Sequence, residues 1–240
     1  MLEAKDFLDL ETLCRELDAS ESSVRRDLDV LEEQNALKRV YGGAVPVQPP
    51  GVSAFDYTVE SGRYSDEKSR IGRLTASLIE DGQTVILDGG STVAAVAGEL
   101  AGKSLHIVTN SLPIAETLEA RRNIELTLTG GYLDPRIRVM LGPLCEQMLN
   151  LIRADVVIMG IGSVSDAGFS NNNTLVVGSE QKMIEIAAKV IIVADHTKFG
   201  RSAMIPVAQL DAADVVVSDS NLAPEYVEML RSNGVEVLLA

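Results

Sequence analysis

The sequence predicts an α/β protein in two unequal parts: a small N-terminal unit of helices and a hairpin, and a larger unit built on a parallel sheet. Two observations lead to this prediction. From residue 66 onward, short apolar runs of strand length alternate with helical stripes, as in parallel sheets covered by helices. Upstream, a proline-rich stretch at residues 45–53 separates two short amphipathic helices from the rest. We expect domains at residues 1–45 and 66–240, with a linker at 46–65.

The composition is that of a globular protein and argues against several kinds of partner. The 240 residues are 46% hydrophobic and 23% charged, which is ordinary for a globular chain. A formal net charge of -14 argues against binding to nucleic acid through bulk positive charge, so any DNA contact must be local. We see no signal peptide, no membrane-length apolar run and no metal-ligand pattern. We therefore expect a cytoplasmic protein with no membrane partner, no bound metal and no cofactor.

The first part carries two helices joined by a short turn. Apolar side chains at helical spacing mark one face of the first helix: Leu10, Leu13, Cys14 and Leu17. The second helix begins after Ser20, a good N-cap residue, and runs to about residue 34. Its buried stripe is expected to contain Val24, Leu28 and Leu31. The opposite face would then expose Ser22, Arg25 and Arg26.

This arrangement is typical of a helix-turn-helix, in which the second helix lies in the major groove of DNA. Arginine side chains there contact phosphates and the edge of guanine. The segment at residues 37–44 is basic, β-prone and contains Gly-Gly, as expected of a wing hairpin. The alternative is an acidic helical hairpin with a solvated outer face, because acidic residues outnumber basic ones in residues 1–45.

The larger part is organised around a strand, a glycine turn and a helix. Thr84–Leu87 is a short apolar strand, Asp88-Gly-Gly-Ser91 interrupts it, and residues 92–100 form a helix rich in small residues. The first N–H groups of a helix have no internal partner and carry partial positive charge, which favours a phosphate. Gly89 and Gly90 would let a ligand approach the main chain. The alternative is an ordinary turn between a strand and a helix.

The other elements follow the same alternation. Apolar, β-branched runs predict strands at residues 105–110, 124–128, 154–160, 190–194, 215–217 and 235–239. Apolar stripes predict helices from residue 66, from residue 111 with a proline in its first turn, and at residues 142–152, 175–188 and 224–232. Residues 162–174 are expected to be an open polar loop. The connectivity predicts a parallel sheet with helices on both faces.

Polar and glycine residues gather where the predicted strands end, and ligands bind beyond those ends in such sheets. The candidate residues are Asp88, Gly89, Gly90, Ser91, Thr92, Thr109, Asn110, Ser111, Gly130, Gly131, Gly162, Lys182, Asp195 and Lys198. Lys198 would supply the charge for a phosphate. Asp88 and Asp195 would hold hydroxyls or brace loops, and Lys182 faces either the pocket or solvent. His196 has no positioned partner in the sequence and is assigned no catalytic role.

Two motifs resemble a known family. Ser20-x-Ser-Ser-Val-Arg-Arg-Asp-Leu28, followed by Lys38-Arg-Val-Tyr-Gly-Gly-Ala44, is similar to the recognition helix and wing of DeoR-type repressors of bacterial sugar metabolism. In that family the motifs read Ser-x-x-Thr-Ile-Arg-Arg-Asp-Leu and Arg-x-His-Gly-Gly-Ala. The resemblance implies DNA contacts from Ser20, Ser22, Ser23, Arg25, Arg26, Lys38, Arg39 and Tyr41. Tyr41 stands where the family usually has histidine.

From residue 67 to the last strand the chain also resembles the effector domain of this family, which is similar to the ribose-5-phosphate isomerase-like fold. The resemblance implies a phosphosugar site lined by residues 88–92, by Thr109 and Asn110, by Gly130 and Gly131, and by Lys198. It further implies a homo-oligomer, either a dimer or a tetramer. The protein is then expected to be no enzyme but a repressor of a sugar or polyol operon, released from operator DNA by a phosphorylated sugar.

One departure from the family concerns the first helix of the winged domain. Family members have a full helix before the segment equivalent to residues 10–17, whereas nine residues precede Leu10 here. The winged helix-turn-helix is therefore expected to be incomplete, to fold poorly and to bind DNA weakly. Two other functions remain open: a sugar-phosphate isomerase or deaminase of the related fold, and a sensor with an impaired DNA-binding head.

Overall fold

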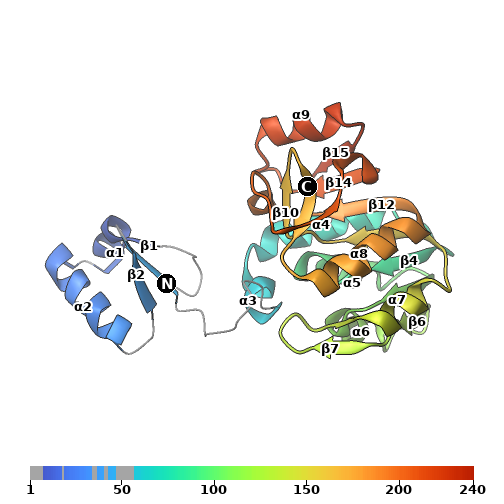
Figure 1. The fold of residues 1–240 in the computed structure, drawn as a ribbon, viewed down its shortest axis with the longest axis horizontal. Coiled ribbons are helices and arrows are strands. Elements are labelled where there is room, and N and C mark those ends of the chain that lie inside the picture. Colours follow the sequence, from blue (N-terminus) through green and yellow to red (C-terminus); the bar gives the residue numbers. More distant parts are fainter. Residues whose placement is uncertain (1–7, 18, 34–36, 41–42, 47–56) are drawn as a thin grey trace. The chain divides into compact units, whose positions relative to one another are not determined.

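The computed structural model describes residues 8–17, 19–33, 37–40, 43–46 and 57–240. The chain divides into two compact units, Met1–Phe55 and Asp56–Ala240 (Figure 1). The linker was expected to reach residue 65, whereas residues 56–65 belong to the larger unit. They differ from the expectation because a helix at this position packs on that unit.

The N-terminal unit is a helix-turn-helix with a wing. Its elements are β1 (Leu8–Asp9), α1 (Leu10–Leu17), α2 (Glu21–Glu33), β2 (Leu37–Val40) and β3 (Gly43–Pro46). The strands form an antiparallel sheet in the order β1-β3-β2, in which Arg39 lies opposite Ala44. Its core consists of Leu13, Val24, Leu28 and Leu37. Two expected members of the apolar stripe, Leu17 and Leu31, are instead 53% and 38% exposed, so this core is small.

The larger unit begins with α3 (Tyr57–Gly62) and α4 (Ser65–Ser77) and continues into a seven-stranded sheet. The strands are β4 (Thr84–Leu87), β5 (Leu105–Thr109), β6 (Ile124–Leu128), β9 (Ala154–Met159), β12 (Ala187–Val193), β14 (Val215–Ser218) and β15 (Glu236–Leu239). All neighbouring strands are parallel, in the order β15-β14-β12-β9-β4-β5-β6. The predicted parallel α/β fold is confirmed.

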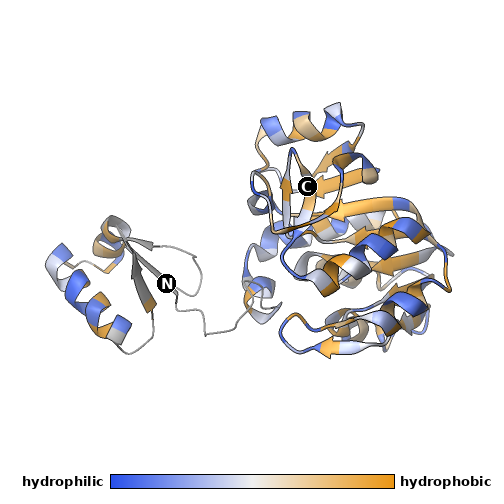
Figure 2. Cartoon of the chain, viewed as in Figure 1, coloured by the Kyte–Doolittle hydropathy of each residue, from blue (hydrophilic) through white to orange (hydrophobic). Residues whose placement is uncertain are grey.

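Helices cover both faces of the sheet (Figure 1). One face packs against α7 (Pro143–Leu149), α8 (Thr174–Ile186) and α9 (Pro224–Ser232). The other packs against α4, α5 (Ser91–Leu100) and α6 (Leu112–Leu118). Successive strand residues alternate between the two faces, as Ile86 and Leu87 do. Both sets are apolar, which explains the continuous hydrophobic strands in Figure 2.

Several short strands differ from the expectation. The segment expected to be an open loop, residues 162–174, contains the hairpin β10 (Ser163–Ser165) and β11 (Gly168–Asn171). The hairpin forms because Val164 and Phe169 are cross-strand partners and both are buried. β11 also pairs with β13 (Ile205–Ala208). A second unpredicted hairpin consists of β7 (Tyr132–Asp134) and β8 (Val139–Leu141).

The order of the strands creates a topological switch point between β4 and β9. β5 and β6 lie on one side of β4, whereas β9 and the later strands lie on the other. Loops leaving the carboxyl ends of β4 and β9 therefore run in opposite directions. Such a switch point is where open α/β sheets bind ligands.

Candidate effector site and DNA-binding surface

The loop after β4 combines a packed glycine with an open one. A Cβ atom at Gly89 would lie 2.2 Å from Cγ1 of Val139, so β8 fills the space that was expected to admit a ligand there. Gly90 has a φ of 119° and open space around its Cβ position. It precedes α5, which has no side-chain cap at its N-terminus. The approach to the N–H groups of this helix is therefore by way of Gly90 and Ser91.

A buried cluster of amides and carboxyls lies beside this loop. Asn110, just after β5, donates from Nδ2 to Oδ1 of Asp88 over 3.2 Å. Asn171 donates from Nδ2 to Oε1 of Glu180 on α8 over 2.9 Å. Among the described residues, Asn110 Oδ1, Ser111 Oγ and Glu180 Oε2 are buried without a hydrogen-bond partner. Buried polar atoms normally have partners, so these three are suited to hydroxyl groups of a ligand.

Two carboxyls in this cluster hold their protons more tightly than usual. Burial raises the pKa of Asp88 to about 6, although hydrogen bonds from the Gly89 N–H and from Asn110 lower it. Burial, together with the nearby charge of Asp88, raises the pKa of Glu180 well above its ordinary value. Ionisation of one of these carboxyls therefore disfavours ionisation of the other.

We expect the stability of the larger unit to fall as the pH rises through the titration of Asp88. The raised pKa means that the folded state binds this proton more tightly than the unfolded chain does, so the stabilisation is complete below pH 4. It is lost between about pH 4 and pH 6. Urea unfolding at pH 4 and pH 7 should show wild type losing on the order of 2 kcal/mol more than Asp88→Asn.

Asp166→Asn, an exposed substitution of the same kind, serves as the control and should follow wild type. Equal pH dependence in wild type and Asp88→Asn would contradict a proton held at Asp88.

A second cluster contains cationic groups beyond the carboxyl end of β12. Lys198 closes the 3-10 turn η2 (His196–Lys198), and its Nζ lies 3.3 Å from Oε2 of Glu60 on α3. Arg63 Nη1 lies 2.9 Å from Oε1 of the same carboxylate. Lys68 of α4 is 3% exposed and donates to the main-chain oxygens of Glu60 and Arg63. Burial lowers the pKa of Lys68, which the charges of Asp195 and Glu60 oppose.

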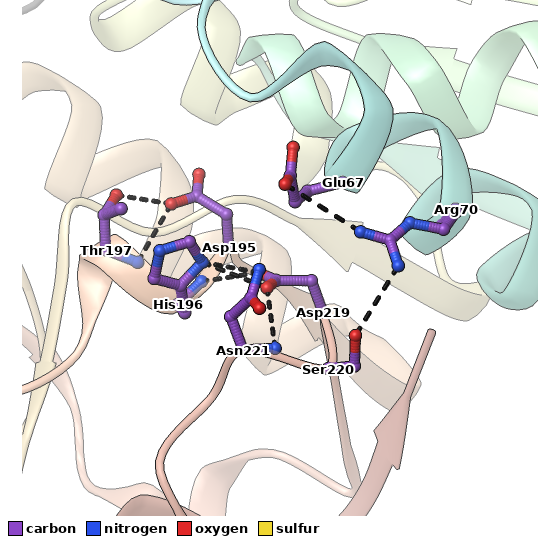
Figure 3. A network of polar contacts seen from close by, with 8 residues as sticks. All are labelled: Glu67, Arg70, Asp195, His196, Thr197, Asp219, Ser220 and Asn221. Atoms are coloured by element: carbon purple, nitrogen blue, oxygen red, sulfur yellow. Dashed lines mark hydrogen bonds and ion pairs between the residues drawn. The ribbon is translucent and has the colours of Figure 1, made fainter. Parts of the chain in front are cut away.

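The turn η2 is fixed by two aspartates (Figure 3). Asp195 caps it, since its Oδ1 accepts hydrogen bonds from the backbone N–H and hydroxyl of Thr197. Asp219, after β14, accepts from the His196 N–H over 2.8 Å and lies 3.0 Å from the ring Nδ1 of His196. Burial raises the pKa of Asp219, but these hydrogen bonds and one from the Asn221 N–H outweigh it and leave the pKa below its usual value. His196 thus has the positioned partner that the sequence did not indicate.

Figure 3 also shows Arg70 of α4 beside Ser220, in the loop after β14. Its guanidinium lies 3.5 Å from the hydroxyl of Ser220 and 3.8 Å from the carboxylate of Glu67. The contact with Ser220 connects α4 to the loop after β14, at the carboxyl edge of the sheet.

Other expected site residues have structural partners. Thr109 donates its hydroxyl to the carbonyl of Leu87 and accepts from the Ser111 N–H, which makes it a brace between β4 and β5. A Cβ atom at Gly131 would lie 2.6 Å from the carbonyl oxygen of Leu141, and one at Gly162 would lie 3.0 Å from that of Ser170. These two glycines therefore serve close packing of the backbone.

Gly130 has a φ of 70° with open space around its Cβ position. Lys182 forms an ion pair with the exposed Glu185 on its own helix. It lies roughly 200° around α8 from Glu180, so the two residues cannot face the same side of the helix. Among Ser91, Thr92 and Gly90, only Thr92 is buried.

The sequence did not indicate Glu60 or Lys68 as members of these clusters, and it indicated Glu180 and Asp219 only as candidate bases if the protein were an enzyme. For Lys68 the signal was present, because it occupies the buried helical face of Ile71 and Thr75. Glu180 likewise lies among the buried residues of α8. A charged residue on an apolar helical face is costly unless it has a function or a partner.

The candidate DNA contacts gather on α2 and the wing. Ser20, Ser22, Ser23, Arg25 and Arg26 are all exposed. Ser20 Oγ accepts from the Ser23 N–H over 3.3 Å and therefore caps α2. Arg25 forms an exposed ion pair of 2.6 Å with Glu21. Lys38 and Arg39 lie in β2, whereas Tyr41 lies outside the described residues.

The described residues were compared with the requirements of a metal site and of a membrane-spanning helix. They contain no cluster of three or more His, Cys, Asp or Glu side chains placed to hold a metal ion. Within the same residues, no helix combines the length and the apolar character needed to cross a membrane.

Comparison with known proteins gives matches along the whole chain. The family profile "DeoR C terminal sensor domain" matches residues 63–220, and "DeoR-like helix-turn-helix domain" matches residues 1–49. The chain is 35% identical over 230 residues to the HTH-type transcriptional repressor GlcR of Bacillus subtilis (strain 168), covering 95% of this chain and 88% of that protein. It is 30% identical to the glycerol-3-phosphate regulon repressor of Escherichia coli (strain K12), covering 100% and 95%.

Among solved structures, the chain is similar to ribose 5-phosphate isomerase A from Methanocaldococcus jannaschii. The sequence identity is 16% and the TM-score 0.43, over 57% of this chain and 55% of that one. The chain thus spans about half the length of that isomerase.

Proposed function

This chain belongs to the DeoR family of DNA-binding transcriptional repressors, and we propose that it represses a sugar or polyol catabolic operon until a phosphorylated sugar binds its larger unit. The proposed binding of an effector is supported by the residues at the carboxyl ends of the strands. An uncapped helix N-terminus at Gly90 and a lysine at position 198 follow the carboxyl ends of β4 and β12, the two strands on either side of β9. Both features favour a phosphate.

The rest of the proposed ligand would contact the buried cluster next to this loop. The partnerless oxygens of Asn110, Ser111 and Glu180 can each form a hydrogen bond with a ligand. The hydroxyl groups of a sugar or polyol both donate and accept hydrogen bonds, so they match these oxygens. The similarity to the glycerol-3-phosphate regulon repressor makes a small phosphorylated polyol one candidate. The proposed site therefore holds the phosphate at Gly90, Ser91 and Lys198, and the carbon chain beside Asn110.

The proposal is tested by a gel-shift titration. DNA fragments selected by the purified protein from its own genome supply the operator. The complex is then titrated with sugar and polyol phosphates, each paired with its unphosphorylated counterpart. A phosphorylated compound should release the DNA while its counterpart does not. If no phosphorylated sugar or polyol changes DNA binding, the proposed effector class is wrong.

We expect Lys198→Gln to weaken binding of the releasing compound about 10- to 100-fold, because a charge-assisted hydrogen bond to phosphate contributes roughly 1.5–3 kcal/mol. Calorimetric titration measures the change. Lys189→Gln is the matched control, since Lys189 lies near the start of β12, paired with Val156, whereas Lys198 lies beyond the end of that strand. Equal losses in the two variants would argue against a phosphate at Lys198.

The proposed repressor acts in the cytoplasm as a homo-oligomer, a dimer or a tetramer, and is not an enzyme. Helix-turn-helix proteins commonly read two half-sites as dimers, which supports the oligomer. Sedimentation at operator-binding concentrations tests it, and a monomer that binds DNA at full affinity would contradict it. Turnover of ribose 5-phosphate by the purified protein would overturn the non-enzymatic role.

A further inference from the structure

The carboxylate of Glu60 lies against Lys198, one of the groups proposed to hold the phosphate of the effector. Glu60 lies on α3, a helix of six residues, and its side chain is 12% exposed. Oε2 is 3.3 Å from Lys198 Nζ, and Oε1 is 2.9 Å from Arg63 Nη1. A buried carboxylate with a cation on each oxygen presents the same charge pattern as a bound oxyanion.

The surroundings favour an anion with more charge than Glu60 supplies. Three cationic side chains, from Arg63, Lys68 and Lys198, lie around the carboxylates of Glu60 and Asp195. Asp195 Oδ2 is buried with no partner among the described residues, so it contributes no hydrogen bond to the lysines. The Lys198–Glu60 distance exceeds the 2.7–2.9 Å of a strong charge-assisted hydrogen bond. A dianionic phosphate would therefore compete well for Lys198.

Hydrogen bonds near both ends of α3 attach it to the rest of the larger unit. The Lys68 ammonium binds the carbonyls of Glu60 and Arg63, and the Tyr57 N–H donates to the carbonyl of Arg136 over 3.0 Å. Tyr64, between α3 and α4, has a φ of 51°, a left-handed conformation that costs a non-glycine residue energy. Strained residues of this kind are common at switch regions.

We propose that Glu60 is an internal ligand that the effector's phosphate displaces from Lys198, an inference that rests on the proposed function. Displacement releases α3 about the turn at Tyr64. α3 directly follows the segment between the two units. Its release therefore lowers the affinity of the N-terminal unit for operator DNA. The pair Glu60–Lys198 is thus the element whose two states, closed and displaced, couple effector binding to operator affinity.

The test uses inorganic phosphate as the probe on the full chain. Calorimetry should show Glu60→Gln binding phosphate about 3- to 10-fold more tightly than wild type, because the internal competitor has lost its charge. Glu185→Gln, which removes an exposed carboxylate from α8, should match wild type. Without any ligand, Glu60→Gln should also bind operator DNA roughly 5-fold more weakly, within the usual range of allosteric coupling.

A second readout follows α3 itself. Amide exchange in residues 57–62 should rise when phosphate saturates wild type, and should be high in Glu60→Gln without phosphate. If Glu60→Gln melts at a much lower temperature, Glu60→Asp, which keeps the charge but is too short to reach Lys198, replaces it.

The two proposals fail in different ways. Phosphate binding that depends on Lys198 but is equal in wild type and the Glu60 variants overturns the internal ligand and leaves the proposed effector site intact. A chain that binds neither phosphate nor any phosphosugar overturns both.

Discussion

Replacing Arg25 and Arg26 together by alanine should lower operator affinity by about 30-fold or more. Each arginine that contacts a base edge or phosphate contributes roughly 1–3 kcal/mol. Both side chains are exposed on α2, the helix that enters the major groove in helix-turn-helix proteins. Arg25 must first leave Glu21, but this exposed pair contributes at most about 0.5 kcal/mol, so its loss does not offset the contact with DNA.

The measurement is a gel shift at several salt concentrations. The dependence of affinity on salt should become shallower by about one counterion for each phosphate contact that is lost. Arg121→Ala with Arg122→Ala is the control, because it removes two adjacent exposed arginines from the larger unit. If this control loses as much affinity as the α2 variant, the contacts are not local to α2.

Leu28→Ala should unfold the N-terminal unit while leaving the larger unit folded. Among the described residues, the core of the small unit contains four buried hydrophobic side chains, and Leu28 is one of them. Truncating a buried leucine costs about 2–5 kcal/mol, which is comparable to the whole stability of a small domain. The large sheet has its own two apolar clusters and does not depend on this residue.

Hydrogen exchange resolved by peptide distinguishes the two units. Residues 10–33 should lose their protection in Leu28→Ala, and operator binding should disappear with it, while residues 84–128 keep theirs. Leu31→Ala, on the same helix but exposed, is the matched control and should change little. Retained protection in Leu28→Ala would mean that this unit has support beyond its four-residue core.

The sheet was predictable because its strands are buried on both faces. Strands such as β4 and β12 then read as continuous apolar runs, which a local pattern reveals. The short hairpins were not predictable. β11 is four residues of mixed polarity, and its pairing depends on β13, a distant segment. α3 was missed because it is polar and short, and because Lys68 of the next helix holds its carbonyls.

The candidate site was predictable at the strand ends and not between helices. Asp88, Asn110, Asp195 and Lys198 follow strands directly, so their shared edge could be derived from the alternation of elements. Glu60 and Glu180 come from helices, and their side chains are positioned by tertiary packing, whereas Asp219 follows β14 directly. Gly89 and Gly90 were both expected to let a ligand approach the main chain. The space around Gly90 is open, whereas the space around Gly89 is filled by Val139.

The position of β4 between β5 and β9 has a consequence for synthesis. β4 and β5 emerge from the ribosome early, but Val85 of β4 must wait for Val156 of β9 before its other edge is covered. Non-local pairing of this kind is slow, and an uncovered strand edge promotes aggregation. The nascent chain should therefore need chaperone protection until β9 has been translated, while the N-terminal unit, whose strands pair within residues 8–46, can fold before that stage.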